Sequence, residues 1–128
     1  MLDHIGLSVA DFGRSKAFYE AALKPLALSL VMEVTAEETG ADAHAGFGVP
    51  DKPFFWIGTG AKPKGGTHVA FAAGTRAEVD SFYEAAIAAG GKDNGAPGLR
   101  PHYHDSYYGA FVLDPDGNNV EAVCHKPA

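Results

Sequence analysis

Two histidines and one glutamate are the side chains of this sequence whose types and surroundings suggest chemistry. His4 and His68 lie 64 positions apart in a chain of 128 residues, and each opens an alternating segment, HIGLSV or HVAFA. In both segments small residues share the side of the histidine, which leaves room for a pocket. Glu121 lies within the apolar segment VEAV, where a lone carboxylate is costly to bury unless a positive group meets it. If these imidazoles and the carboxylate converge on one cavity, they would hold one divalent metal ion: Fe(II), Zn(II), Mn(II) or Ni(II).

An internal repeat accounts for the spacing of the two histidines. An ungapped shift of 64 places FYEAA at 18–22 on the same letters at 82–86, and Phe47 on Phe111. Two copies of a unit this long are too few for a solenoid. They indicate a duplicated module, with copies at about 1–62 and 65–128 that together form one domain.

Each module is expected to contain a strand, a helix and then three strands. The first helix is predicted to begin near Asp11 or Arg14 and to end at Leu23, before a proline. The second begins with the capping-box pattern TRAE and ends at a Gly-Gly pair. The later strands are predicted at 26–34, 44–49, 54–59, 107–114 and 119–125, with a DPDG turn before the last. Residues 90–101, rich in Gly, Asn and Pro, are expected to form a long loop.

Composition and charge restrict the class of partner. The formal net charge of −6 argues against a nucleic acid. The sequence has no apolar run near the roughly 20 residues of a membrane helix, and its first residues lack a signal-peptide pattern. The single cysteine, Cys124, excludes an intrachain disulfide and suits a reducing compartment. We therefore expect a cytoplasmic protein with a small-molecule ligand, and no nucleic-acid or membrane partner.

The duplicated module resembles the glyoxalase/bleomycin-resistance/extradiol-dioxygenase superfamily, also called vicinal oxygen chelate. The segments that carry the resemblance are HIGLSV, FYEAAL, HVAF and, most specifically, DPDGNNVEAV near the end. The resemblance covers the whole chain. It implies an α+β fold in which two tandem βαβββ modules form a curled mixed sheet around a cleft. It also implies that His4, His68 and Glu121 are metal ligands, and that the protein is a homodimer.

The fourth metal-ligand position of the family is not an acid in this chain. Family lyases and thiol transferases usually place a second glutamate on the last strand of the first module. The shift of 64 puts Ile57 there, and no acid occurs between Phe54 and Gly60. The order His, His, Glu resembles the extradiol dioxygenases, which are usually larger, more than it resembles glyoxalase I. The resemblance thus implies a metal-dependent enzyme, dioxygenase-like or lyase-like, whose metal chelates two adjacent oxygens of the substrate.

The segment RPHYHDSYY, residues 100–108, concentrates side chains suited to proton transfer and substrate binding. The candidate catalytic residues are His102, Tyr103, His104 and Tyr107. The candidate substrate-binding residues are Phe54, Trp56, Arg100 and Tyr108, with Arg100 suited to a carboxylate or phosphate.

Two alternatives to this chemistry stay open. The segment 100–108 is also compatible with a solvated loop whose aromatic rings pack together. The whole chain is also compatible with a metal-free protein that sequesters a small molecule, as bleomycin-resistance proteins do.

Overall fold

The computed structural model describes the backbone of residues 1–128 and every side chain except that of Thr39. The first half contains β1 (Ile5–Ser8), α1 (Phe12–Leu23), the 3-10 helix η1 (Lys24–Leu26), β2 (Ser29–Val34), α2 (Ala36–Thr39), β3 (His44–Val49) and β4 (Lys52–Gly58). The second half contains β5 (His68–Ala72), α3 (Arg76–Ala88), β6 (Lys92–Leu99), β7 (Tyr108–Leu113) and β8 (Asn119–Cys124). Apart from the short helices η1 and α2, both halves follow the predicted order of strand, helix and three strands.

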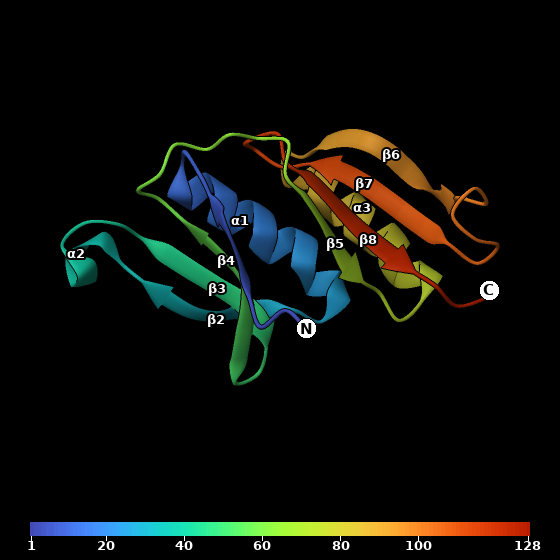
Figure 1. The fold of residues 1–128 in the computed structure, drawn as a ribbon, viewed down its shortest axis with the longest axis horizontal. Helices are drawn as coiled ribbons and strands as arrows, with labels where there is room; N and C mark the ends of the chain where they lie inside the picture. Colours follow the sequence, from blue (N-terminus) through green and yellow to red (C-terminus); the bar gives the residue numbers. More distant parts are fainter.

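The strands form two four-stranded sheets, in the orders β1-β4-β3-β2 and β5-β8-β7-β6. In each sheet the first and last strands of the module run parallel, and the other pairs are antiparallel. The sheets lie side by side, and α3 lies behind the strands of the second sheet (Figure 1). The α+β class and the two βαβββ modules are therefore confirmed. Each module has its own sheet, because β1 and β5 stand at the ends of their sheets and do not pair with each other.

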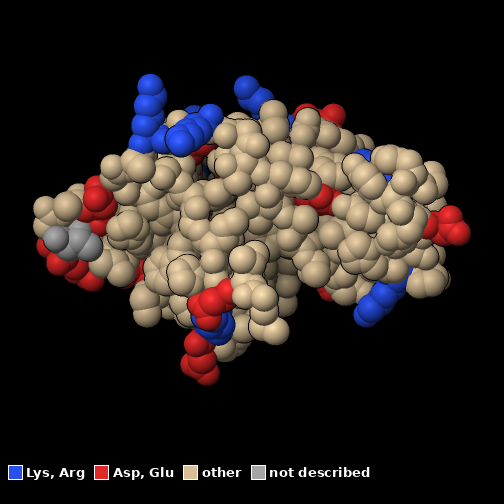
Figure 2. Space-filling view, in the orientation of Figure 1, with Lys and Arg blue, Asp and Glu red and all other residues tan. Residues whose placement is uncertain are grey.

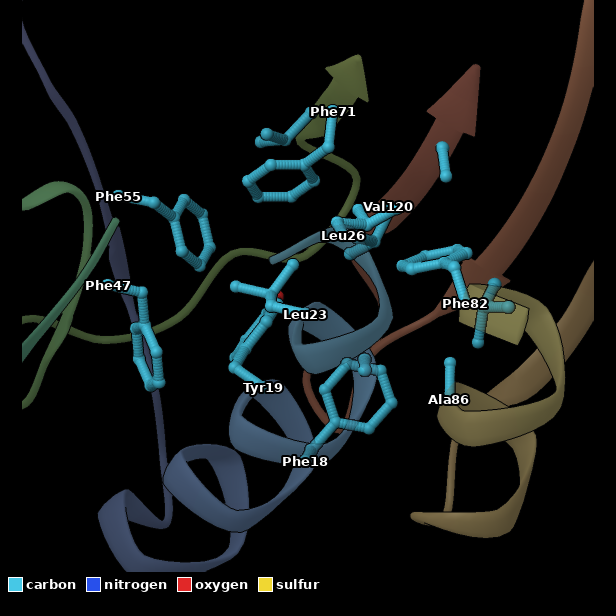
Figure 3. Close-up of a cluster of buried hydrophobic side chains, with 14 of the residues drawn as sticks. Phe18, Tyr19, Leu23, Leu26, Phe47, Phe55, Phe71, Phe82, Ala86 and Val120 are labelled. Carbon is cyan, nitrogen blue, oxygen red and sulfur yellow. The ribbon is translucent and has the colours of Figure 1, made fainter. Parts of the chain in front are cut away.

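The hydrophobic core lies between the sheets and the two long helices (Figure 3). The repeated FYEAA segments supply much of it, since Phe18, Tyr19 and Phe82 are each 0% exposed. The ring of Phe55 on β4 lies 5.2 Å from that of Phe71 on β5, measured between centroids. The core therefore continues from one half of the chain into the other.

Both long helices begin at the predicted cap residues. The Asp11 carboxylate accepts a hydrogen bond from the Arg14 amide at 3.1 Å, and the Thr75 hydroxyl accepts one from the Glu78 amide at 3.1 Å. These bonds satisfy amide groups that have no partner within the first helical turn. The capping signals in the sequence thus place the helices that follow β1 and β5.

The DPDG hairpin links the second half to the first helix. The Gly117 amide donates to the Asp114 carbonyl at 3.0 Å, and Gly117 has φ of 83°, which glycine adopts without strain. The buried Asp114 carboxylate accepts the Tyr19 hydroxyl of α1 at 2.5 Å. The neighbouring Asp116 carboxylate accepts the Ala10 amide at 3.2 Å. The predicted hairpin is therefore confirmed, and it also fixes the two halves against each other.

The loop predicted at 90–101 is wrong, because the structure has β6 there, paired antiparallel with β7. The register of this pair shifts on both sides of Gly95, which has φ of 150°. The strand also stands at the end of its sheet, where Pro97 is tolerated because the outer side needs no ladder hydrogen bonds. Pairing with β7 overrides the weak strand propensity of this segment.

In the described part of the chain, no helix is long and apolar enough to cross a membrane. On the face seen in Figure 2, most charged side chains lie towards the rim, and the middle is largely uncharged. Figures 1 and 2 share one orientation, so this largely uncharged middle lies on the side from which the strands of Figure 1 are seen.

Candidate metal and ligand site

The Glu121 carboxylate is the centre of the candidate site. Glu121 is 1% exposed, and it is the one charged residue in the otherwise mainly apolar strand β8. His68 Nε2 lies 2.8 Å from Glu121 Oε1, and the Tyr107 hydroxyl donates a short hydrogen bond to Oε2. Both carboxylate oxygens therefore have polar partners, which offsets the free energy lost on removing the charge from water.

Strand pairing places these side chains on one face of the second sheet. Ala70 of β5 stands opposite Glu121 of β8, and His68 lies two residues before Ala70, so both acid and imidazole project from the same side. Gly109 of β7 lies between the Glu121 carboxylate and the Tyr107 ring. A Cβ atom at Gly109 would lie 3.3 Å from Glu121 Oε2 and 3.2 Å from the Tyr107 ring. The missing side chain lets the Tyr107 hydroxyl reach the carboxylate.

The environment of Tyr107 keeps its hydroxyl protonated. Burial, and then the hydrogen bond to Glu121, raise the pKa of Tyr107 above its usual value. Its ring lies against Tyr103, His104 and His125, with centroid distances of 4.8, 5.5 and 5.3 Å. Tyr107 is therefore a fixed hydrogen-bond donor to the buried carboxylate.

His4, the third predicted metal ligand, lies apart from this cluster. Its Nδ1 is 2.8 Å from Asp3 Oδ1, which also accepts Lys52 Nζ at 2.7 Å. The hydrogen bonds from Lys52 and His4 lower the pKa of Asp3. His4 and His68 both line a cavity of about 470 Å³ at the start of β1 and β5. Among the side chains that the structure describes, no three His, Cys, Asp or Glu residues could together hold a metal ion.

The predicted apolar residues of the first module line two cavities. Phe54 lines the cavity of about 470 Å³ that also includes His4 and His68. Trp56 lines a separate cavity of about 210 Å³ with Gly6 and several neighbours. The structure therefore brings Phe54 close to both histidines and places Trp56 further along β4.

Arg100 and Tyr108 lie on opposite sides of β7. The Arg100 guanidinium donates to two carbonyls of β6 at 2.8 Å each and lies 5.4 Å from the centroid of the Phe111 ring, over its face. Phe111 stands opposite Glu121 in the strand pair, so Arg100 is on the same face as the carboxylate. The Tyr108 hydroxyl instead donates to Asp80 of α3 at 2.6 Å, on the helix side of the sheet. The structure does not bring Tyr108 together with Glu121.

The turn between β6 and β7 carries the remaining predicted residues. His102 and Tyr103 contact each other with centroids 4.3 Å apart, and Tyr103 is 60% exposed. His104 Nε2 lies 2.8 Å from His125 Nδ1, with the rings stacked. Sequence reasoning missed the contact of His125 with His104, because a separation of 21 positions corresponds to no strand or helix period.

The structure corrects the equivalence between the two modules at the last strand. Gly6 stands opposite Trp56, whereas Ala70, the repeat partner of Gly6, stands opposite Glu121. The residue equivalent to Glu121 is therefore Trp56, and the assignment to Ile57 was wrong. Ile57 is 1% exposed and faces the core. A one-residue difference in spacing moves a side chain to the other face of the sheet, and an ungapped shift cannot detect it.

Comparison with known proteins identifies the family. A sequence profile of the Glyoxalase/Bleomycin resistance protein/Dioxygenase superfamily matches residues 1–122, and the chain belongs to this superfamily. A comparison with curated proteins gave no match.

Solved structures share the fold over nearly the whole chain. A glyoxalase/bleomycin resistance protein from Albidiferax ferrireducens T118 is 28% identical with a TM-score of 0.81, covering 97% of this chain and 98% of that one. A mutant of glyoxalase I from Zea mays is 25% identical with a TM-score of 0.72 and covers 95% of this chain, which spans only 46% of the maize protein. A glyoxalase/bleomycin resistance protein/dioxygenase family enzyme from Burkholderia phytofirmans PsJN shows the fold alone, with 19% identity and a TM-score of 0.70 over 97% of this chain and 98% of that one.

Proposed function

We propose that the protein is a cytoplasmic, metal-dependent enzyme that binds two adjacent oxygens of a small molecule, with dioxygenase-like or lyase-like chemistry. The observation that carries this proposal is the buried Glu121 carboxylate, held between His68 and Tyr107. A buried charged group is often less stabilising than an apolar side chain of similar volume. Breaking the apolar pattern of β8 in this way is typical of a functional position.

The donor types of the cluster fit a divalent metal ion, which would use His68 and Glu121. An imidazole and a carboxylate suit Fe(II), Zn(II), Mn(II) and Ni(II). Tyr107 occupies Glu121 Oε2, so a metal ion would bind Oε1 and His68 Nε2 and replace the 2.8 Å hydrogen bond between them. A metal bound there would act as a Lewis acid for negative charge on the substrate oxygens.

A third donor has to come from outside the cluster, and we assign it to His4 across a homodimer. β1 and β5 each have one edge without a strand partner in the described chain. Free strand edges favour pairing with another chain. Two copies that pair through these edges would bring the partner subunit's His4 to the His68–Glu121 pair.

We propose roles for the other predicted residues, apart from Tyr108, from the groups that they contact. Arg100 lies on the face of Glu121 and suits a carboxylate or phosphate of the substrate. Phe54 and Trp56 supply apolar walls. On the turn, Tyr103 and His104 contact the Tyr107 ring and His102 contacts Tyr103, so these three residues are candidates for proton transfer.

A metal-free binding protein is the second candidate, and Trp56 favours it. An indole stands where the equivalent residue of the second module is the acid Glu121. Apolar aromatic walls are a common feature of small-molecule pockets. In this case the two cavities would hold a ligand without catalysis.

Metal content distinguishes the two candidates. We expect protein purified without chelator or affinity metal to contain about one equivalent of a divalent metal, and the His68→Ala variant to contain none. Bound iron would favour oxygen chemistry; zinc, nickel or manganese would favour lyase-type chemistry. A wild-type protein that takes up none of these metals, even under anaerobic loading, would leave only the binding function.

Mixed dimers test whether the site is shared between subunits. His4→Ala and His68→Ala homodimers should each bind no metal. When the two variants are refolded together, a shared site leaves one intact metal site in each mixed dimer, because both changes fall in the other site. If no metal binding is recovered from mixed dimers of proven composition, each site lies within one chain.

A further inference from the structure

We infer that His125 is a positioning residue: through His104 it holds Tyr107 in place, and Tyr107 in turn fixes the orientation of the Glu121 carboxylate. Four side chains form one chain of contacts: His104 and Tyr107 of the β6–β7 turn, Glu121 of β8, and His125 just after β8. Only the consequence for metal affinity rests on the proposed function. The positioning itself is a property of the protein without metal.

The hydrogen bonds around His104 define its tautomer. The Ser106 amide donates to His104 Nδ1 at 3.1 Å, so this nitrogen carries the lone pair. The proton of the neutral ring is then on Nε2, which donates to His125 Nδ1 at 2.8 Å. The His125 ring, just after the end of β8, therefore acts as the acceptor that anchors the turn.

The same tautomer argues against a metal ion between the two rings. A cation bound to His104 Nε2 would need the lone pair there, and the ring proton would move to Nδ1. That proton would face the Ser106 N–H, which already points at Nδ1 from 3.1 Å. The pair is therefore a hydrogen bond that stabilises the turn.

The stacked histidine pair packs against the Tyr107 ring. Tyr107 meets His125 edge to face, with an interplanar angle of 86°, and meets His104 at 70°. Its backbone is also fixed, since the Tyr107 amide donates to the His104 carbonyl at 3.2 Å and its carbonyl accepts the Arg100 amide at 2.8 Å. The histidine contacts and these backbone hydrogen bonds together direct the hydroxyl towards Glu121 Oε2.

The orientation of the Glu121 carboxylate depends on this arrangement. In the described hydrogen bonds, no backbone amide donates to the Glu121 carboxylate, so the carboxylate is oriented by Tyr107 and His68. The side chain of His68 is 52% exposed, whereas Tyr107 is half-buried and in contact with three rings, so Tyr107 limits the carboxylate more than His68 does. Residues that orient a ligand through hydrogen bonds commonly change metal affinity 10–100-fold when replaced.

NMR of the metal-free protein tests the inference directly. Protein labelled at the Glu side-chain carboxyl carbons and the His ring nitrogens should show shifted Glu121 and His68 signals in His125→Leu. The His125→Asn variant keeps an acceptor near the position of Nδ1 and should restore both signals. His102→Leu is the matched control, because His102 lies in the same turn and has no described hydrogen bond to the pair. Circular dichroism checks that each variant is folded.

A double-mutant cycle shows whether the effect passes through Tyr107. In a Tyr107→Phe background, His125→Leu should cause no further shift of the Glu121 signal. An unchanged Glu121 signal in His125→Leu, or an equal shift with and without the Tyr107 hydroxyl, would overturn the inference. With Ni(II) as probe, calorimetry should show about a 10-fold loss of affinity in His125→Leu. A wild-type protein that binds no Ni(II) would count against the metal site, whereas the NMR result would still decide the role of His125.

Discussion

At the scale of the residue, two buried acids have different kinds of partner, and this separates structure from function. Asp114 accepts backbone amides of its own hairpin in addition to the Tyr19 hydroxyl. Among the described residues, the donors to the Glu121 carboxylate are side chains alone, one of them the partly exposed His68. Backbone donors fix Asp114 as part of the fold, whereas the partners of Glu121 can rearrange around a ligand.

Exchange of each acid for its amide should show this difference. Hydrogen-bond donors now reach both carboxylate oxygens of Asp114, and Asp114→Asn leaves a single oxygen to accept them. We therefore expect the free energy of unfolding to fall by about 2 kcal/mol. Glu121→Gln retains an acceptor for Tyr107 and should change that free energy by less than about 1 kcal/mol, while abolishing metal binding. Urea unfolding and metal analysis of both variants provide the measurements. Equal destabilisation by the two changes would contradict this separation of roles.

The Tyr19–Asp114 bond gives a second prediction, with a matched control in the repeat. Tyr19→Phe should lower the free energy of unfolding by about 1.5–3 kcal/mol, because it removes a buried hydrogen bond to a charged group. Tyr83, the repeat partner of Tyr19, bonds Asp93 at the surface, so Tyr83→Phe should have a much smaller effect. Thermal unfolding of the two variants compares them, and a larger loss for Tyr83→Phe would refute the assignment.

Alkaline pH tests the same bond independently. Burial, and then the charge of Asp114, raise the pKa of Tyr19 far above its usual value. A raised pKa in the folded state means that the neutral hydroxyl stabilises the fold below the unfolded-state pKa of about 10. That contribution should be lost as pH rises above this value. Wild-type protein should therefore lose stability more steeply than Tyr19→Phe above about pH 10 in pH-dependent urea unfolding.

At the scale of the element, strand register decides which side chains face the site. β1 and β4 pair so that Gly6 meets Trp56, and β5 and β8 pair so that Ala70 meets Glu121. Neighbouring residues on β4 therefore have opposite environments: Trp56 lines a cavity, while Ile57 is in the core. The two residues are adjacent in the sequence, but their side chains lie on opposite faces of the sheet.

A glutamate placed at each position should reveal this register. Ile57→Glu puts an unpaired carboxyl in the core and should lower the free energy of unfolding by more than about 3 kcal/mol. Trp56→Glu puts the same group on the cavity side and should leave the protein folded. Circular dichroism and urea unfolding distinguish the outcomes. Better tolerance of the glutamate at Ile57 than at Trp56 would show that the assigned register is incorrect.

At the scale of the whole molecule, the two halves share one core. Phe55 and Phe71 meet between the sheets, and the DPDG hairpin of the second half bonds residues of the first. α1 and α3 also pack against each other. Each half alone would expose this apolar surface and leave buried polar groups without partners.

Separated halves should therefore not fold. Polypeptides 1–62 and 65–128 are each expected to lack dispersed NMR amide signals and cooperative unfolding. An equimolar mixture should recover both, because it restores the contacts between Tyr19 and Asp114 and between Phe55 and Phe71. Cooperative unfolding of either isolated half would show that the modules are independent.

The sequence by itself determined the features that depend on local pattern. Alternation predicted most strands, capping signals predicted both long helices, and the repeat predicted two βαβββ modules with FYEAA in the core. His68 and Glu121 were found because they interrupt apolar or small-residue patterns on adjacent strands. These signals are readable because hydrophobic burial imposes a period on each element.

Only the tertiary structure decided features that depend on pairing between distant segments. β6 is a strand because β7 supplies its hydrogen bonds, not because its residues favour extended structure. Trp56 is the counterpart of Glu121 because strand register, not residue counting, sets the face of the sheet. His125 reaches the site, and His4 lies apart from it, because positions in space follow from how the sheets pack, which no local pattern records.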